Sequence, residues 1–257
     1  LTQGSTVLAV VPSTYTGALV VNGSSDNDTL VIDYAGGIPV PVGGVTFNGR
    51  GQAGGDGDAL TVQNGTFANV TFNYDSAVGN PNAQSGTINM DGRVVTFANL
   101  SPINFLSPVV NYTFNLPGTN DQAVLEDDSS PGAAVAGSSR LRSAAVSPTF
   151  EATTFKNPTG SALFNMGGDN GTFTVGASFQ TETPNFAGAL TIRGQNGADT
   201  ISVDTTVTKG MTLLGDAGND TIAGGGGIDS VSGDLGDDVI QVRDNDAEFD
   251  TVQGGDG

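Results

Sequence analysis

Residues 215–241 consist of three nine-residue units in tandem: GDAGNDTIA (215–223), GGGGIDSVS (224–232) and GDLGDDVIQ (233–241). Each unit opens with Gly, has Gly at its fourth place and Asp at its sixth, and has Ile or Val at its eighth. Glycine allows the backbone to adopt positive φ, and Asp adds a short carboxylate. Each unit therefore predicts a turn that points carbonyl and carboxylate oxygens inward, with the apolar residue at a strand position.

The same pattern extends on both sides of these units. The motif apolar-x-Gly-x-x-Gly-x-Asp occurs as IRGQNGAD (192–199), LLGDAGND (213–220) and VSGDLGDD (231–238), and it begins again at VQGGDG (252–257). Its opening glycines, at 194, 215, 233 and 254, are 21, 18 and 21 residues apart. One coil then holds two short strands and two turns, which is the repeat of a parallel β-solenoid.

The upstream sequence carries weaker copies of the motif at wider spacing. These copies keep an acid at Asp28, Asp58 and Asp121, whereas Gly171 stands at the equivalent place in MGGDNGTFTV (166–175). The segment GTINMDGRVVTF (86–97) predicts an antiparallel hairpin, because Asp91-Gly92 suits a two-residue turn. Other predicted strands lie in 28–34, 59–65, 70–75, 94–100 and 199–205, and the small, polar segment 127–147 predicts a loop.

The predicted fold is therefore all-β, a parallel β-solenoid with an antiparallel, hairpin-bearing upstream region. We expect a longer-coiled or mixed β region over 1–185 and a regular solenoid over 186–257. The chain begins at Leu1 without Met and stops inside a repeat, which predicts a piece of a longer protein.

Composition restricts the function. The 257 residues include 27 Asp and Glu against 8 Lys and Arg, a formal charge of −19, which disfavours nucleic acid and anionic membrane as partners and favours cations. Cys and His are absent, which excludes disulfides, thiol chemistry and His-dependent catalysis, and leaves the oxygen ligands that suit calcium. No apolar run approaches the 18 residues that would suggest a membrane span.

Stacked coils bring the repeated acids together. One turn supplies only about half of the six to eight oxygen ligands that calcium takes, so a turn of the next coil, about 4.8 Å away, must complete the shell. Without a cation, two such carboxylates repel each other by roughly 3 kcal/mol at an effective dielectric constant near 20. The candidate ligands on one side of the solenoid are Asp199, Asp220 and Asp238, with Asp216 and Asp234 as helpers.

On the other side of the solenoid the candidate is Asp229, with partners among Asp244, Asp246 and Asp250. Asp28, Asp58 and Asp121 are weaker candidates, because a lone acidic turn is also explained by an Asx turn. A solvated turn without metal is the alternative for the whole row. Arg193 and Arg243 lie beside acidic turns, where we expect charge pairing.

The three nonapeptides resemble the hemolysin-type (RTX) calcium-binding repeat GGxGxDxUx, with Asp216 and Asp234 in place of the second Gly. The resemblance implies a β-roll in which successive turns share calcium ions through Asp carboxylates and backbone carbonyls. The segments 70–103, NYTFNLPGTNDQAVLEDD (111–128) and FEATTFKNPTGS (150–161) are similar to repetitive calcium-binding surface proteins of bacteria. That similarity implies an extracellular, multi-unit scaffold or adhesin and carries over no catalytic residue.

These observations predict a calcium-stabilised structural module of a large secreted or cell-surface protein, part of a fibre, filament or adhesin, and not an enzyme. The expected partners are calcium ions and, through end-to-end self-association, other copies or neighbouring repeats of the same chain. Two alternatives stay open: the calcium-binding tail of a secreted toxin or hydrolase, and a β-helical polysaccharide-processing enzyme.

Overall fold

The computed structural model describes residues 2–3, 6–7, 14–50, 57–75, 84–118, 120–128, 136–179, 186–242 and 250–256. Over these ranges the chain is all-β and forms no helix. The described part of the chain accordingly has no helix of the length and apolarity needed to cross a membrane.

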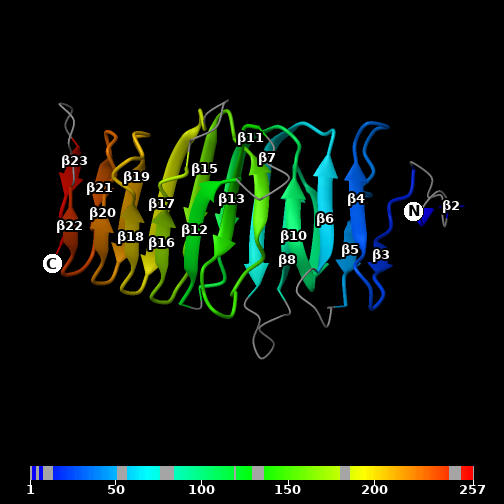
Figure 1. The fold of residues 1–257 in the computed structure, drawn as a ribbon, viewed down its shortest axis with the longest axis horizontal. Helices are drawn as coiled ribbons and strands as arrows, with labels where there is room; N and C mark the ends of the chain where they lie inside the picture. The colour runs from blue at the N-terminus through cyan, green and yellow to red at the C-terminus, as the bar shows by residue number, and fades with distance from the viewer. Residues whose placement is uncertain are drawn as a thin grey trace.

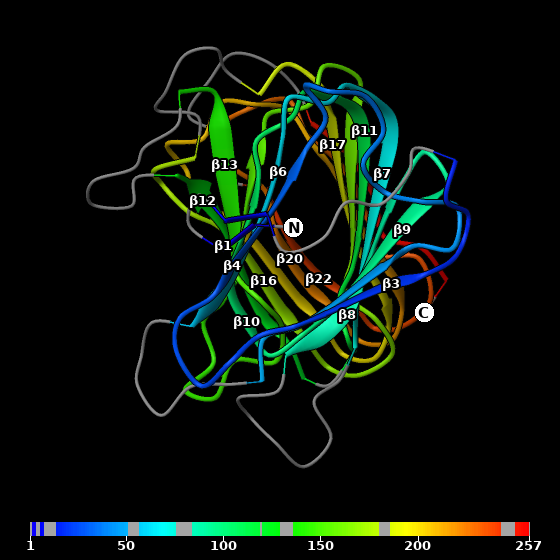
Figure 2. The ribbon, with the colours of Figure 1, turned by 90° about the vertical axis from the view of Figure 1, so that its right-hand side faces the viewer.

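The described strands form two large mixed sheets that face each other along the length of the molecule (Figures 1 and 2). In spatial order the eleven-stranded sheet holds β3 (Leu19–Asn22), β5 (Val45–Asn48), β9 (Arg93–Ala98), β8 (Ser85–Met90), β7 (Phe67–Asp75), β11 (Val109–Asn115), β15 (Ser161–Asn165), β17 (Ala189–Asn196), β19 (Thr212–Ala217), β21 (Ser230–Ser232) and β23 (Thr251–Gln253). The ten-stranded sheet holds β4 (Thr29–Asp33), β6 (Asp58–Gln63), β10 (Leu100–Phe105), β14 (Thr153–Lys156), β13 (Ser138–Ser143), β12 (Gln122–Asp127), β16 (Thr172–Val175), β18 (Thr200–Val203), β20 (Thr221–Ala223) and β22 (Val239–Gln241). A separate short pair, β1 (Thr2–Gln3) and β2 (Thr6–Val7), lies near the N-terminus.

From β15 onward the chain alternates between the two sheets, and each strand pairs in parallel with the strand one coil further on. A coil here means one passage of the chain through both sheets. The register keeps apolar side chains in columns, such as Ile192, Leu213, Val231 and Val252. The prediction of two short strands and two turns per coil is confirmed in this part of the chain.

Two antiparallel meanders interrupt the alternation upstream, one in each sheet. In the first, β7, β8 and β9 are joined so that β7 lies further along the molecule than β9, although it comes earlier in the sequence. The predicted hairpin at 86–97 is confirmed as β8 and β9, with Asp91 (φ 48°) and Gly92 (φ 88°) forming the turn. The meanders meet across the core, where the hydroxyl groups of Tyr74 and Thr153 lie 2.7 Å apart.

The second meander corrects the prediction of a loop over 127–147. Residues Ser138–Ser143 form β13, which pairs antiparallel with both β12 and β14. Its sequence SSRLRS contains a single apolar residue, Leu141, which is fully buried. Arg142 is stabilised by an ion pair to Glu126 on the neighbouring strand (2.7 Å). A strand held by its neighbours on both sides needs little apolar pattern of its own, which is why the sequence alone suggested a loop.

A single core runs between the sheets from Ile32 to Val231. Within this core, phenylalanines on adjacent strands stack, Phe72 on Phe114 (5.0 Å between centroids) and Phe114 on Phe164 (4.9 Å). Beyond Phe164 the column continues with the aliphatic residues Ile192 and Leu213. The predicted boundary near 185 falls beside residues 180–185, which lie outside the described residues, and β15 pairs directly with β17 across it.

Glu151 is a buried acid inside this core. Its side chain is 1% exposed, and its Oε2 has no hydrogen-bond partner. Burial raises the pKa of Glu151 from 4.5 to about 8. The folded state therefore retains a proton that the unfolded chain loses, so this group's contribution to stability is full below pH 4.5 and is lost as the pH rises to about 8.

We expect the Glu151→Gln variant to escape this loss, because its amide does not ionise. Melting temperatures of variant and wild type should differ little near pH 4.5, and the variant should melt increasingly higher than wild type as the pH rises to about 8. Thermal melts across this range test the expectation. A constant difference at every pH would contradict it.

Candidate functional site

The repeated acids form two rows, each at the start of successive strands of one sheet. The first ladder lies at the ten-stranded sheet and consists of Asp28, Asp58, Asp121, Asp199, Asp220 and Asp238. The second ladder lies at the eleven-stranded sheet and consists of Asp229 and Asp250. Gly171 takes the place of an acid between Asp121 and Asp199, at the position expected from the sequence. The strands β10, β14 and β13 separate Asp58 from Asp121, so the first ladder has an N-terminal and a C-terminal part.

In the C-terminal part of the first ladder and in the second ladder, one carboxylate oxygen of each acid ties two coils together. The main-chain N–H of Asp199 donates to Oδ1 of Asp220 (2.8 Å), and the N–H of Asp220 donates to Oδ1 of Asp238 (2.8 Å). The N–H of Asp229 donates in the same way to Oδ1 of Asp250 (2.7 Å). Each of these acids therefore completes the backbone hydrogen bonding of the preceding coil. The sequence pattern located the acids but did not indicate this contact.

In five acids of the two ladders, the second carboxylate oxygen, Oδ2, has no hydrogen-bond donor. Oδ2 is buried without a hydrogen-bond partner in Asp58, Asp199, Asp220, Asp238 and Asp250. Burial, with the nearby Asp220 and Asp216 charges, raises the pKa of Asp199 to about 7, and burial likewise raises the pKa of Asp220. Leaving a buried carboxylate oxygen unpaired opposes folding, so these atoms need either a proton or a cation.

The conformation of the turn explains why Oδ2 is left without a donor. In the turn 224–229, the N–H of Gly225 donates to Oδ2 of Asp229 (2.9 Å). In the turns 194–199, 215–220 and 233–238 the second residue instead has positive φ, 76° at Gln195, 69° at Asp216 and 66° at Asp234. The N–H of Gln195 donates to Asp216 of the next coil (3.2 Å) and not to its own turn's acid.

The opening glycine of each turn makes room for that oxygen. A Cβ atom at Gly194 would lie 2.6 Å from Oδ2 of Asp199 and 2.6 Å from the carbonyl oxygen of Gly215 in the next coil. Equivalent pairs of oxygens flank Gly215 and Gly233. The Gly-x-x-x-x-Asp spacing of the nonapeptides is thus a packing requirement as well as a turn signal.

The oxygens that converge at these glycines are of the kind that calcium binds. Each place combines a buried carboxylate Oδ2 with a main-chain carbonyl oxygen from the next coil, and both are hard oxygen donors. Among the described residues no three acidic side chains converge on one point. A cation here would therefore be held by carboxylates of successive coils together with main-chain carbonyls.

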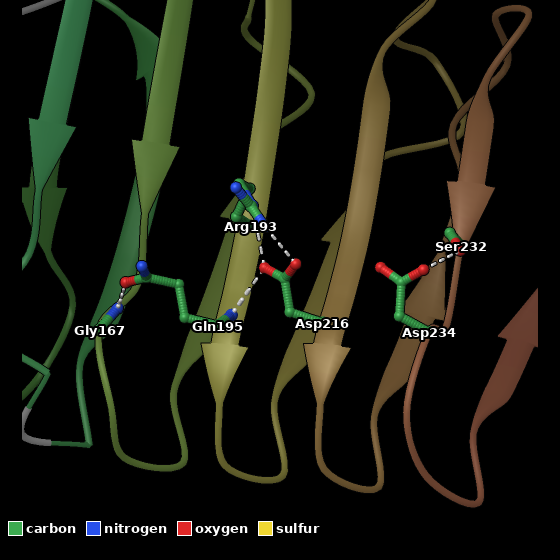
Figure 3. Close-up of polar contacts among 6 residues, drawn as sticks. All are labelled: Gly167, Arg193, Gln195, Asp216, Ser232 and Asp234. Atoms are coloured by element: carbon green, nitrogen blue, oxygen red, sulfur yellow. Dashed lines mark hydrogen bonds and ion pairs between the residues drawn. The ribbon is translucent and has the colours of Figure 1, made fainter. Parts of the chain in front are cut away.

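Asp216 and Asp234 occupy the same place in successive coils, where β19 and β21 end (Figure 3). Arg193 donates two hydrogen bonds to Asp216, from Nε at 3.0 Å and from Nη2 at 2.5 Å. Asp234 accepts a hydrogen bond from the hydroxyl of Ser232 (2.7 Å). The predicted charge pairing of Arg193 is confirmed, and the Asp216 carboxylate is engaged by it.

Of the predicted ligands, Asp199, Asp220 and Asp238 stand in one row, and Asp250 stands beside Asp229 as the sequence suggested. Asp244, Asp246 and Arg243 lie outside the described residues. Asp58 and Asp121, the weaker candidates, are buried and stand at the starts of strands as the later acids do. They share with the later acids a position two residues before an inward-facing apolar residue, as in Asp58-Ala-Leu60.

Comparison with known proteins gave no match: no family model, no curated protein and no solved structure is significantly similar to the chain.

Proposed function

We propose that this chain is a β-solenoid stabilised by calcium, and that it serves as a structural module of a large secreted or cell-surface protein, part of a fibre, filament or adhesin. One observation carries the proposal. Successive coils place buried aspartate oxygens without donors beside carbonyl oxygens of the next coil. A stack of such acids opposes folding unless a cation or protons neutralise it.

Calcium would act through the residues of the two ladders. In the C-terminal part, Asp199, Asp220 and Asp238 would bind it through Oδ2, because their Oδ1 atoms already accept hydrogen bonds. Asp250 would do the same in the second ladder. When bound, the ion would replace the repulsion between aspartates of successive coils with metal–ligand bonds. The free energy of metal binding would then add to the free energy of folding.

The proposed role follows from shape and charge. The two sheets run the length of an elongated molecule whose termini lie at opposite ends (Figure 1), a form suited to a spacer. The charge of −19 disfavours anionic surfaces and nucleic acid as partners and favours cations. We therefore propose an extracellular location, where free calcium is abundant.

We expect the whole chain to melt at a higher temperature in millimolar calcium than in EGTA, and magnesium to give a much smaller shift because it demands a tighter octahedral shell. Circular dichroism melts in the three solutions test this. A stabilisation of about 3–4 kcal/mol is expected when calcium exceeds its dissociation constant by about 100- to 1,000-fold. Equal melting temperatures in calcium and EGTA would refute the role of calcium.

A further inference from the structure

The sequence contains five Asn-Gly pairs, at 22–23, 48–49, 64–65, 170–171 and 196–197. In such a pair the main-chain nitrogen of glycine can attack the side-chain amide carbon of asparagine, because glycine has no side chain to hinder the approach. The attack closes a five-membered succinimide ring and releases ammonia. The contacts of the glycine N–H and of the asparagine amide therefore decide which pair reacts in the folded chain.

Of the five glycine N–H groups, all of which lie in the described ranges, only that of Gly171 donates to a carboxylate. Its partner is Oδ1 of Asp199 in the next coil (2.7 Å). In three of the other pairs the glycine N–H donates to a main-chain carbonyl oxygen, and in the pair 64–65 it donates to the hydroxyl of Ser107. A carboxylate at hydrogen-bond distance is positioned to take the proton as the nitrogen attacks, which a carbonyl oxygen cannot do.

The side-chain amide of Asn170 faces the same coil as the N–H of Gly171. Its Oδ1 accepts a hydrogen bond from the N–H of Ala198 (2.8 Å), the residue before Asp199. Because Ala198 and Asp199 are neighbours in the chain, they hold the asparagine amide and the glycine nitrogen on the same side of the turn, as ring closure requires. The N–H of Ala198 is also placed to stabilise the negative charge that develops on Oδ1 during the attack.

The surroundings of this pair favour the reaction. Oδ2 of Asp199 is buried and has no hydrogen-bond donor, so the carboxylate is poorly stabilised as an anion and readily accepts a proton. Asn170 is exposed, so ammonia can leave and water can enter. Packing also requires the glycine, since a Cβ at Gly171 would lie 2.8 Å from Cε of Met166. The turn thus supplies a nucleophile, a proton acceptor, a donor to the oxyanion and access to water.

We propose that Asn170-Gly171 is a self-modification site, at which the folded chain converts Asn170 to aspartate and isoaspartate. The nitrogen of Gly171 bonds to Cγ of Asn170 as its proton passes to Oδ1 of Asp199. The bond from Cγ to the side-chain nitrogen then breaks, and that nitrogen takes up the proton and leaves as ammonia. Water adds to either carbonyl of the succinimide and opens the ring. The net change consumes water and releases ammonia, without oxidation or reduction.

Either product adds a carboxylate beside the place where the first ladder lacks one. Gly171 stands between Asp121 and Asp199 in that row, and residue 170 is its neighbour in the chain. The modification therefore adds one negative charge to this turn. The reaction needs no cation, so it stands whether or not calcium binds to the ladder.

Two other asparagines provide matched comparisons within the same chain. Asn196-Gly197 has the glycine but no base, because the N–H of Gly197 donates to the carbonyl oxygen of Ala217 (2.9 Å). Asn219 has the same two kinds of contact with the next coil as Asn170. It is followed by Asp220, however, whose side chain hinders ring closure. The first comparison isolates the base, and the second isolates the glycine.

Peptide mapping by mass spectrometry measures the conversion at each asparagine of the whole folded chain. The chain is incubated in mildly alkaline buffer with EGTA, so that Asp199 is ionised and holds no cation. We expect Asn170 to react about 100-fold faster than Asn196, the lower end of what a positioned base contributes, and also faster than Asn219. In urea, Asn170 should react more slowly than in the folded chain, because its contacts with the next coil are lost.

The Asp199→Asn variant removes the base, while its amide oxygen can still accept the hydrogen bond from Gly171. It should slow the reaction at Asn170 by about 100-fold and leave Asn196 unchanged. Asp237→Asn is the matched control, since it removes an exposed carboxylate of a later coil, and it should leave the rate at Asn170 unchanged. Thermal melts show that both variants are folded.

Three results would each overturn the proposal: equal rates at Asn170 and Asn196 in the folded chain, an unchanged rate at Asn170 in Asp199→Asn, or a rate at Asn170 that rises on unfolding. The last result would mean that the stacked coils protect this pair. None of them alters the comparison of melting temperatures in calcium and EGTA, so self-modification and the proposed function fail separately.

Discussion

The Gly218→Ala variant is expected to lose about 3 kcal/mol or more of unfolding free energy, because two costs combine at this residue. Gly218 has φ of 139°, a conformation that L-residues rarely adopt. A Cβ there would also run into the carbonyl oxygen of Gly197, in the turn one coil earlier. Since that oxygen belongs to the backbone, the two coils would have to separate.

The coils are held close at this point by hydrogen bonds that the substitution would break. The N–H of Gly197 donates to the carbonyl of Ala217 (2.9 Å), and the N–H of Gly218 donates to the carbonyl of Leu235 (2.8 Å). Urea denaturation measures the loss. Gly168→Ala is the control, since a Cβ at Gly168 would meet nothing within 4 Å, and it should change stability by less than about 1 kcal/mol. If Gly218→Ala and Gly168→Ala unfolded at the same urea concentration, the close packing described for the turns would be contradicted.

The second large effect is expected at Asp220, where one substitution should raise the stability of the protein in EGTA and lower it in calcium. In Asp220→Asn the amide keeps the shape of the carboxylate and can still accept the hydrogen bond from the N–H of Asp199. In EGTA we expect the variant to be more stable than wild type by about 1–3 kcal/mol, because it removes a buried charge with an unpaired oxygen. In calcium we expect it to be less stable than wild type, because a ligand of the ion is lost.

Thermal melts of wild type and variant in both solutions give the comparison. Asp237→Asn is the matched control: it removes the same charge one residue before Asp238, at an exposed position. It should shift both melting curves little and by similar amounts. If Asp220→Asn were destabilising to the same extent in EGTA and in calcium, the carboxylate would act through its hydrogen bond alone, and the cation would have no part in the ladder.

The local chemistry of the repeats determined much of this structure. Gly at the first and fourth places and Asp at the sixth place of each nonapeptide predicted the turns, and the apolar eighth residue predicted the strands that follow. Asp91-Gly92 predicted the hairpin, and Arg193 beside an acidic turn predicted an ion pair. These predictions held because a turn of six residues depends on its own backbone and on near-identical neighbours.

Tertiary structure decided what the repeats do not encode. The order of β7, β8 and β9, and the existence of β13, depend on contacts between strands far apart in sequence, such as Tyr74 with Thr153. The alignment of Asp58 with Asp28 likewise depends on pairing across coils of unequal length. A periodic sequence specifies the register only where the period is constant; where coils vary in length, packing of the two sheets on one core sets the register.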